Sequence, residues 1–201
     1  MKLFHYDHCP YCVKARMIFG LKNVPFELQA LANDDEKTPV GLVGRKMLPI
    51  LVKDDGVAIA ESLDIITYID GLAEFGKPIV GPSLQSQELN RWLQQARGYH
   101  YALAMPRWPQ MGLEEFQTES AIAYFTRKKS LSIGPFSEAL EASAELVVLA
   151  EAALSELEVI LKNTGNLGSS GDTITIDDFH LFATLRVLTV VRQLKLSLIH
   201  I

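Results

Sequence analysis

The chain opens with Lys2-Leu3-Phe4-His5-Tyr6-Asp7-His8-Cys9-Pro10-Tyr11-Cys12, a strand-like segment that runs directly into two cysteines three positions apart. Residues 13–20 follow with the apolar spacing of a helix. The first cysteine therefore lies at a helix N-terminus, where unpaired backbone N–H groups and the helix dipole favour a thiolate. No other cysteine occurs in the 201 residues. Such a pair can close a disulfide and reopen it, which is the chemistry of a dithiol oxidoreductase.

The two cysteines are expected to have different roles. Lowering a thiol pKa from ~8.5 to ~5 takes about 4.8 kcal/mol, whereas a helix dipole contributes about 0.3–1 kcal/mol. The remainder must come from N–H and S–H donors of Tyr11 and Cys12 that point at the Cys9 sulfur. Pro10 removes one donor but fixes φ early in the helix, which helps to aim the others. We therefore predict that Cys9 is the nucleophile and Cys12 the resolving thiol, with Pro10 and Tyr11 in support.

Two other uses of the cysteines are open. They could be buried structural residues, or they could form half of a metal site. His5 and His8 lie close enough in sequence for two thiolates and two imidazoles to ligate zinc. No second Cys-x-x-Cys or His pair completes a separated site, and a Cys-x-x-Cys motif beside a βαβ pattern indicates redox use. We therefore predict a redox site and no bound metal.

Composition narrows the class of protein. Apolar residues make up 48% of the chain and charged residues 21%, which is ordinary for a soluble globular protein. The net charge of −5 and the lack of a long basic run argue against nucleic-acid binding. No apolar segment reaches membrane-spanning length, and the start of the chain does not resemble a signal peptide. We expect a cytoplasmic protein, where cysteines stay reduced unless they are catalytic or redox-sensing.

The first part of the chain has the pattern of a small sheet with helices. Asp54-Asp55-Gly56 is a strong hairpin signal between two strand-like segments. We expect strands at residues 2–6, 25–31, 48–53 and 57–60, and helices at 13–20, 40–43 and 63–70. Strand, helix, strand, then hairpin and helix is the thioredoxin-like order, and we assign it to residues 1–75 as an α/β domain.

Glycine and proline then interrupt the pattern, and residues 76–83 are predicted to be a linker. Beyond them we expect an all-α domain over residues 84–195, with helices near 85–99, 114–131, 136–161 and 177–194. Thr175-Ile176-Asp177-Asp178 has the form of a capping box, although Asp replaces the usual Glu or Gln. A loop of small residues is expected at 165–172.

The last six residues, Leu196-Ser197-Leu198-Ile199-His200-Ile201, match the translation of an adapter used in sequencing libraries. We expect residues 196–201 to be a non-native tail that should be left out of fold reasoning, with the genuine C-terminal segment missing. A natural apolar terminus is the alternative.

The motif and its surroundings resemble a known family. Cys-Pro-Tyr-Cys resembles the glutaredoxin motif, whereas thioredoxins carry Gly-Pro between their cysteines. The segments 7–12, 14–23 and 49–51 are similar to those of the larger bacterial glutaredoxin 2 family, and the likeness continues through Asp177-Asp178 and Leu185-Arg186. The resemblance implies a thioredoxin-like glutaredoxin domain joined to an all-helical domain like that of glutathione transferases.

The resemblance also implies a glutathione site. Leu48-Pro49 matches the position of a cis-proline in thioredoxin-like folds, which leaves the backbone before it free to pair with the cysteinyl unit of glutathione. Glu61-Ser62 matches the γ-glutamyl site: Ser62 would hold the α-carboxylate at a helix N-terminus and Glu61 the α-amino group. A plain helix cap would have the same sequence. The cation for the glycine carboxylate is left open among Lys22, Arg45 and Lys46.

The predicted activity is glutathione-dependent reduction of glutathione mixed disulfides and protein disulfides, by a monomer with glutathione as cosubstrate and no bound cofactor. The alternatives are a glutathione transferase, which would not need a second active thiol, a noncatalytic binding module and an iron–sulfur carrier. In the helical part, aromatic residues could line a substrate groove, but core packing is the preferred interpretation for Trp92, Tyr99, Tyr101 and Trp108. His100, His180 and His200 are likewise expected to be structural.

Overall fold

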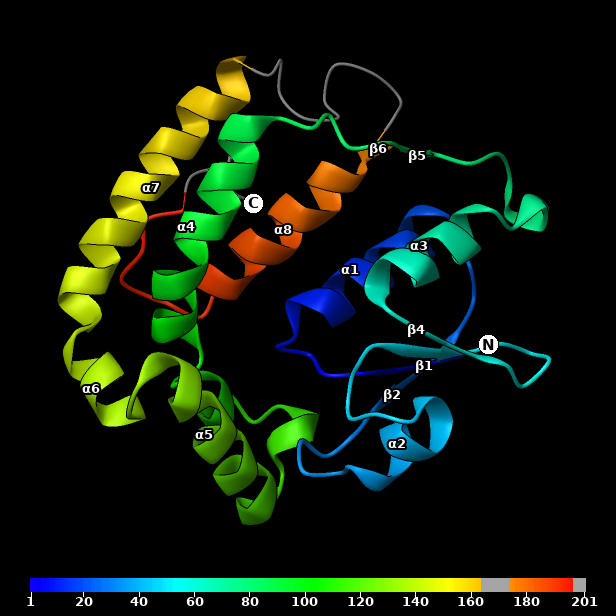
Figure 1. Cartoon of the computed structure of the whole chain (residues 1–201), viewed down its shortest axis with the longest axis horizontal. Helices are drawn as coiled ribbons and strands as arrows, with labels where there is room; N and C mark the ends of the chain where they lie inside the picture. Colours follow the sequence, from blue (N-terminus) through cyan, green and yellow to red (C-terminus); the bar gives the residue numbers. More distant parts are fainter. Residues whose placement is uncertain (164–173, 197–201) are drawn as a thin grey trace. The chain divides into compact units, whose positions relative to one another are not determined.

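The computed structural model describes residues 1–163 and 174–196 (Figure 1). The chain forms two compact units, one made of residues 1–78 and 112–125 and the other of residues 79–111 together with those from 126 on. The division after residue 78 falls inside the expected linker 76–83. Residues 112–125 belong to the first unit, although the sequence analysis placed them within the helical domain 84–195.

A four-stranded sheet in the order β2-β1-β3-β4 forms the centre of the first unit. Strand β1 (Lys2–His5) pairs in parallel with β2 (Glu27–Ala30) and antiparallel with β3 (Ile50–Val52), which continues through the expected hairpin into β4 (Ala58–Ala60). The register aligns Leu3 with Leu28 on one side and with Leu51 on the other. The predicted strand order is therefore present, with each strand one to three residues shorter than expected.

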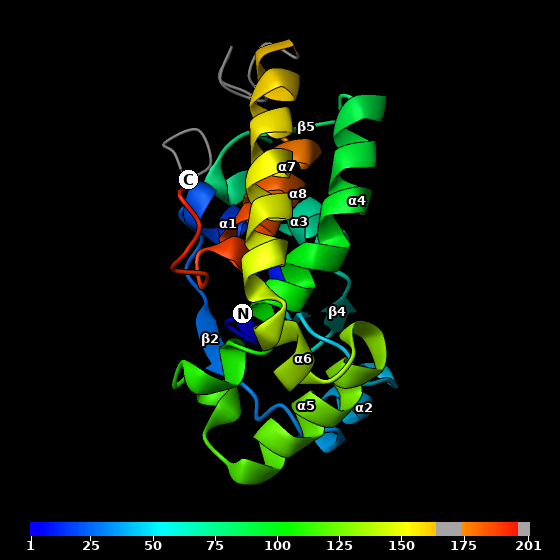
Figure 2. The ribbon, with the colours of Figure 1, turned by 90° about the vertical axis from the view of Figure 1, so that its left-hand side faces the viewer.

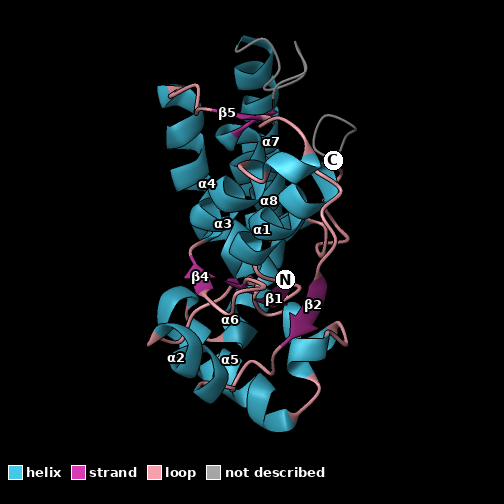
Figure 3. Ribbon diagram, turned by 90° about the vertical axis from the view of Figure 1, so that its right-hand side faces the viewer, coloured by secondary structure: helices cyan, strands magenta, loops and turns pink. Residues whose placement is uncertain are grey.

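Helices cover both faces of this sheet. Helices α1 (Pro10–Leu21) and α3 (Ser62–Asp70) pack together on one side, and α2 (Lys37–Val43) lies on the other (Figures 1 and 3). Because side chains alternate along a strand, Leu3 and Phe4 contribute to different layers of the core. Phe4, Tyr6, Leu31 and Ile50 form a buried cluster with Leu42 and Val43 of α2 against it. A short 3₁₀ turn, η1 (Ala73–Phe75), follows α3.

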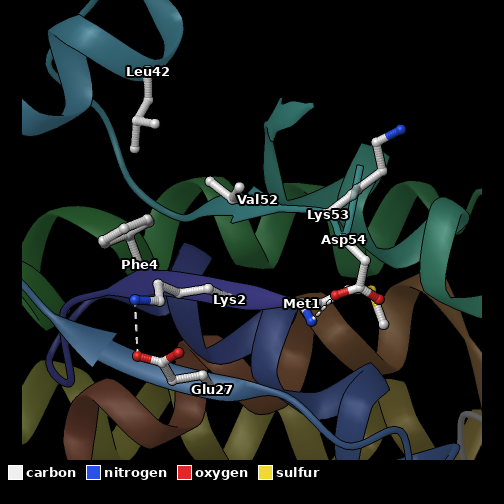
Figure 4. A pocket seen from close by; sticks show the side chains of 8 residues that line it. All are labelled: Met1, Lys2, Phe4, Glu27, Leu42, Val52, Lys53 and Asp54. Carbon is white, nitrogen blue, oxygen red and sulfur yellow. Dashed lines mark hydrogen bonds and ion pairs between the residues drawn. The ribbon is translucent and has the colours of Figure 1, made fainter. Parts of the chain in front are cut away.

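A pocket of about 460 Å³ opens where α2 faces the sheet (Figure 4). Apolar side chains of β1, α2 and β3 line it beside two ion pairs: the Met1 ammonium lies 2.5 Å from Asp54, and Lys2 lies 2.9 Å from Glu27. Its lining residues are Met1, Lys2, Phe4, Glu27, Leu42, Val52, Lys53 and Asp54. Neither cysteine lines this pocket, so it is separate from the redox motif.

The second unit is built on three long helices. These are α4 (Gln87–Ala104), α7 (Ser143–Asn163) and α8 (Ile176–Leu188), of which α4 packs against both others (Figure 2). Strands β5 (Val80–Gly81) and β6 (Ile174–Thr175) form a two-residue parallel pair that the sequence did not predict. Asp178 accepts hydrogen bonds from the backbone N–H and hydroxyl of Thr175, both at 2.7 Å, so the expected capping box is confirmed.

The aromatic residues of this unit serve its packing. Trp92 is buried in the helical core and donates its indole N–H to the carbonyl of Ala153 at 2.7 Å. His100 packs edge-on against Trp92 and Tyr99, and its burial lowers its pKa to about 4. Trp108 is buried with Tyr101 against it. The preference for core packing at Trp92 and Trp108, and for a structural His100, is thus confirmed.

Two predicted helices differ from the observed ones. The helix expected at 114–131 is a 3₁₀ turn, η3 (Glu114–Phe116), followed by α5 (Glu119–Ile133), because the Thr118 hydroxyl accepts the N–H of Ala121 and starts a new helix. The helix expected at 136–161 is divided into α6 (Phe136–Glu141) and α7.

Local polar contacts mark the ends of these helices. The Ser143 hydroxyl at the start of α7 donates to the backbone carbonyl of Ala139 at 3.4 Å, a contact that competes with a continuous helix. Helix α8 ends at Leu188 rather than 194, and a second 3₁₀ turn, η2 (Trp108–Gln110), follows α4. The loop expected at 165–172 lies outside the described residues, as does the expected tail apart from Leu196.

No described helix combines the length and the apolar character that a bilayer-spanning segment requires.

A buried lysine, Lys22, links several segments of the first unit through hydrogen bonds. Lys22 follows α1, and its ammonium group donates to the carbonyls of Asp70 at 2.7 Å, Lys77 at 3.2 Å and Gly76 at 3.4 Å. The Asp70 carboxylate, also buried, lies 3.7 Å from the same nitrogen. Because a buried cation needs such partners, Lys22 joins the ends of α1 and α3 to the segment that leaves the unit.

Replacing Lys22 by methionine is expected to destabilise the protein by about 3–5 kcal/mol, since the Asp70 carboxylate would lose its buried cation. Urea denaturation followed by circular dichroism measures the change. The matched control is Lys77→Met, because the Lys77 side chain is exposed and only its carbonyl takes part. Equal stability of the two variants would contradict this role of Lys22.

Candidate functional site

Cys9 occupies the N-cap of α1, and Pro10 is the first residue of the helix, as predicted. The Cys9 N–H donates to the carbonyl of Tyr6 at 3.4 Å, and the Cys9 carbonyl accepts the N–H of Val13 at 3.0 Å. The turn between β1 and α1 therefore places the Cys9 sulfur beside the free N–H groups of the first helical turn. Cys9 is half-buried, whereas Cys12, one turn further along, is fully buried.

The surroundings of the two sulfurs drive their pKa values apart. The pKa of Cys9 is lowered to about 6, mainly because the Cys12 side chain donates a hydrogen bond to it. Burial opposes this shift, while the charge of His8 and the backbone N–H groups of Cys12 and Tyr11 support it. The pKa of Cys12 is raised well above its usual value by burial and by the neighbouring Cys9 sulfur. At neutral pH the half-buried Cys9 sulfur is thus ionised and the fully buried Cys12 sulfur protonated.

Lys14 is close to this charge. It is buried rather than part of a solvated helix face, and its ammonium lies 4.7 Å from the centre of the Tyr11 ring. Burial lowers the pKa of Lys14, while the charges of Cys9 and Glu61 raise it. Both acidic groups therefore lie within electrostatic reach of Lys14. Arg16, also on α1, forms an ion pair with Asp7 at 2.5 Å.

The two histidines next to the motif do not form a zinc site with the cysteines. Among the described residues, no three His, Cys, Asp or Glu side chains gather in the way a metal ion requires. The His8 imidazole instead has its Nδ1 2.7 Å from the Glu115 carboxylate. The same carboxylate oxygen accepts the backbone N–H of His8 at 3.0 Å. Sequence reasoning missed Glu115, because nothing local links it to a motif 107 residues away.

The expected glutathione-binding residues lie in the first unit, as the two cysteines do. The Leu48–Pro49 peptide bond is cis, as expected, and leads into β3. Leu48 packs with Cys9 against the cluster of Phe4 and its neighbours. Ser62 is buried and begins α3, as expected, and Glu61 precedes it with an exposed side chain. Glu61 has φ 70° and ψ 126°, a backbone conformation that residues other than glycine rarely adopt.

The three candidate cations are engaged in different ways. Lys22 is excluded as a glutathione ligand, because its ammonium is buried among the carbonyls that follow α3. Lys46 donates to the Tyr6 hydroxyl at 2.8 Å and to the carbonyls of Asn33 and Asp35. Arg45 donates to the Glu61 carboxylate at 2.8 Å and is largely exposed. Of the three candidates, Arg45 is therefore the one that forms an ion pair with a residue of the predicted γ-glutamyl site.

Comparisons with known proteins agree with this geometry. Residues 88–198 match the family model "Glutaredoxin 2, C terminal domain", and residues 3–78 match "Glutathione S-transferase, N-terminal domain". Glutaredoxin 2 of Escherichia coli K12 is 42% identical over 191 residues, which cover 95% of this chain and 86% of the relative. The chain belongs to the glutaredoxin 2 family.

Solved structures extend the comparison. The crystal structure of glutaredoxin 2 from Salmonella typhimurium in complex with glutathione matches with a TM-score of 0.87 and 42% identity, covering 98% of this chain and 87% of that one. A glutathione transferase from Phanerochaete chrysosporium, at 16% identity and a TM-score of 0.73, shares the fold. A thioredoxin-like domain combined with a helical domain like that of glutathione transferases is thus the architecture of this glutaredoxin.

Cys12→Ala is expected to raise the pKa of Cys9 well above about 6, because the side-chain hydrogen bond from Cys12 is the main cause of the low value. Cys12→Ser keeps an O–H donor and should raise it less. The pH dependence of the iodoacetamide alkylation rate measures both, since only the thiolate reacts. Identical titration curves for the wild type and Cys12→Ala would contradict the assigned cause.

Proposed function

We propose that this glutaredoxin reduces glutathione mixed disulfides through Cys9 and protein disulfides through Cys9 and Cys12 together. Glutaredoxins are glutathione-dependent oxidoreductases, and this chain is one of them. The division of labour between the cysteines is the proposed part. It is supported by one observation: the more accessible sulfur has a pKa of about 6, while the buried sulfur has a raised pKa.

The reaction follows from these two sulfurs. The Cys9 thiolate attacks the glutathionyl sulfur of a mixed disulfide, whose S–S bond breaks, and the other thiolate leaves and takes up a proton. A second glutathione, as thiolate, attacks the glutathionyl sulfur on Cys9, which forms glutathione disulfide and restores the Cys9 thiolate.

In the dithiol route, Cys9 first attacks a protein disulfide. Cys12 then loses its proton and attacks the Cys9 sulfur, which closes the internal disulfide and releases the reduced protein. Two glutathione molecules reopen that disulfide. The raised pKa of Cys12 keeps it protonated until a disulfide forms on Cys9 and removes the neighbouring negative charge.

Glutathione binding is proposed for Leu48, Pro49, Glu61 and Ser62. The backbone of Leu48, a residue that packs against the same buried cluster as Cys9, would pair with the cysteinyl unit. Ser62 at the start of α3 would receive the α-carboxylate, and Glu61 the α-amino group. The positive φ of Glu61 supports a functional role, because backbone conformations that cost about 1–3 kcal/mol cluster at ligand sites.

The transferase alternative is less favoured. Proteins of that class share the fold at 16–20% identity, a likeness that concerns the architecture alone. A transferase activates the thiol of glutathione itself and needs no second active thiol, whereas here Cys12 is the main cause of the low pKa of Cys9. Conjugation of an electrophile faster than disulfide exchange would favour the transferase.

The setting and partners are proposed on the same grounds. Because the reaction consumes reduced glutathione, we propose that the protein acts in the cytoplasm. Its proposed substrates are glutathionylated or disulfide-containing proteins, and we propose that it acts on them as a monomer.

Serine substitutions test the roles of the two cysteines. Cys9→Ser is expected to abolish activity, because the nucleophile is lost. Cys12→Ser should keep the release of glutathione from a glutathionylated substrate but lose the reduction of protein disulfides. A glutathione-coupled assay on both substrates, with circular dichroism to verify folding, measures this. An equal loss of glutathione release in the two variants would refute the assignment.

A second substitution tests the γ-glutamyl site. Glu61→Gln is expected to raise the KM for glutathione about tenfold, because a charge-assisted hydrogen bond contributes about 1.5 kcal/mol. Little change in kcat is expected. The control is Asp64→Asn, which removes another exposed carboxylate from the first turn of α3. The same KM change in both variants would point to a general charge effect and not to Glu61.

A further inference from the structure

We propose that Glu115 is a positioning residue, which holds the imidazole of His8 in its charged form beside Cys9 and thereby stabilises the Cys9 thiolate. The proposal rests on the role of Cys9 as nucleophile proposed above. It assigns a function to residues 112–125, which pack with the redox domain although they lie between helical segments of the other unit.

The geometry fixes His8 through two separate contacts to one oxygen. Glu115 Oε1 lies 2.7 Å from the imidazole Nδ1 and accepts the backbone N–H of His8 at 3.0 Å. The imidazole is stacked between Tyr6 and Phe116, with ring centres 5.5 and 5.1 Å away, and Phe125 meets it edge-on at 5.1 Å. The ring therefore has little freedom to turn away from the carboxylate.

The hydrogen bonds from His8, which act against burial, explain why this pair should carry charge. Glu115 is fully buried, and its second oxygen, Oε2, has no hydrogen-bond partner among the described residues. A buried carboxylate is costly unless a cation faces it, and His8 is the residue that faces it. Burial alone would raise the pKa of Glu115, yet the hydrogen bonds from His8 outweigh it and the pKa lies below its usual value. The His8 imidazole Nδ1 faces this ionised carboxylate at 2.7 Å.

His8 precedes Cys9 directly in the chain, so its charge acts on the sulfur at short range. That charge lowers the pKa of the Cys9 thiol. Other titratable groups also surround the two residues, and they are identical in the two variants compared below. They are His5 of β1 and Tyr6 directly after it, the Asp7–Arg16 ion pair, Lys14 of α1, and Asp35 and Lys46 near the Tyr6 hydroxyl. Cys12 of α1, the remaining group, is replaced by serine in both variants.

The carboxylate can be removed with little loss of packing. The backbone carbonyl of Glu115 accepts the N–H of Asn33 at 2.9 Å, and this bond does not involve the side chain. Phe116 and Phe125, both buried, remain against the His8 ring. Glu115→Gln has the same shape and changes the charge. Glu114→Gln, an exposed neighbour in the same turn, is the matched control.

The experiment is the iodoacetamide alkylation rate of Cys9 between pH 5 and 8 in a Cys12→Ser background, which leaves Cys9 as the only thiol. The Cys12→Ser background already raises the pKa of Cys9 somewhat above about 6, and loss of the Glu115 charge should raise it by about one further unit. Glu115→Gln should therefore react about five- to tenfold more slowly than Glu114→Gln at pH 6, and the difference should shrink toward pH 8. Equal rates at pH 6, a faster rate, or the same slowing at every pH would overturn the proposal. The last outcome would mean a structural role.

A second measurement uses the protein with Glu115 in place. The ¹⁵N chemical shifts of the His8 ring, assigned by comparison with His8→Gln, should be those of a doubly protonated imidazole at pH 7. A neutral ring would overturn the proposal even if Glu115→Gln failed to fold. Neither measurement involves glutathione or a disulfide, so its failure would leave the proposed reaction intact, and failure of the activity assays would leave the His8 charge state untouched.

Discussion

The redox site depends on one sulfur being negatively charged while it is partly covered by protein. A thiolate in such a place must be stabilised by donors that are already fixed, because water cannot supply them. Here the N-terminus of α1, the Cys12 thiol and the backbone of Tyr11 and Cys12 converge on Cys9. The fold of the first unit holds these donors in place. The turn after β1 leads directly into α1, and α3 packs on α1 and fixes it against the sheet.

The same requirement separates the two cysteines. Cys12 donates its hydrogen bond to Cys9 only while it is protonated, and its full burial keeps it so. Burial of the resolving thiol therefore helps to keep the nucleophile ionised. Burial is the largest cause of the raised Cys12 pKa and persists, but once a disulfide forms on Cys9 the contribution of the neighbouring sulfur charge is gone, so Cys12 loses its proton more readily. A mixed disulfide on Cys9 thus activates the thiol that can resolve it.

Local signals in the sequence predicted much of this structure. The strand before the cysteines, the Asp-Gly hairpin, the helix after Glu61 and the Thr175 capping box each depend on neighbouring residues, and each is present. Core packing of the tryptophans in the helical part was also predicted correctly. The breaks at residues 117–118 and 142 were missed, because a single contact between a hydroxyl and the backbone, at Thr118 or at Ser143, decides each of them within a helical pattern.

Long-range polar contacts could not be predicted. Glu115 meets His8 across 107 residues, and Lys22 meets Lys77 across 55. Each resembles an ordinary surface charge in the sequence, and only the folded chain buries it. The packing of residues 112–125 in the first unit was not predicted for this reason: their helical pattern is local, but the buried Glu115 and Phe116 that attach them to the first unit are not recognisable beforehand.

The most direct test is to find which sulfur accepts glutathione. The Cys12→Ser and Cys9→Ser variants can each be exposed briefly to glutathione disulfide at pH 7, quenched with acid and analysed by peptide mass spectrometry. A thiolate at position 9 and a protonated thiol at position 12 predict a glutathione adduct on Cys9 in the first variant and almost none on Cys12 in the second. Comparable adducts on both cysteines, or a faster one on Cys12, would contradict the assignment of Cys9 as the ionised nucleophile.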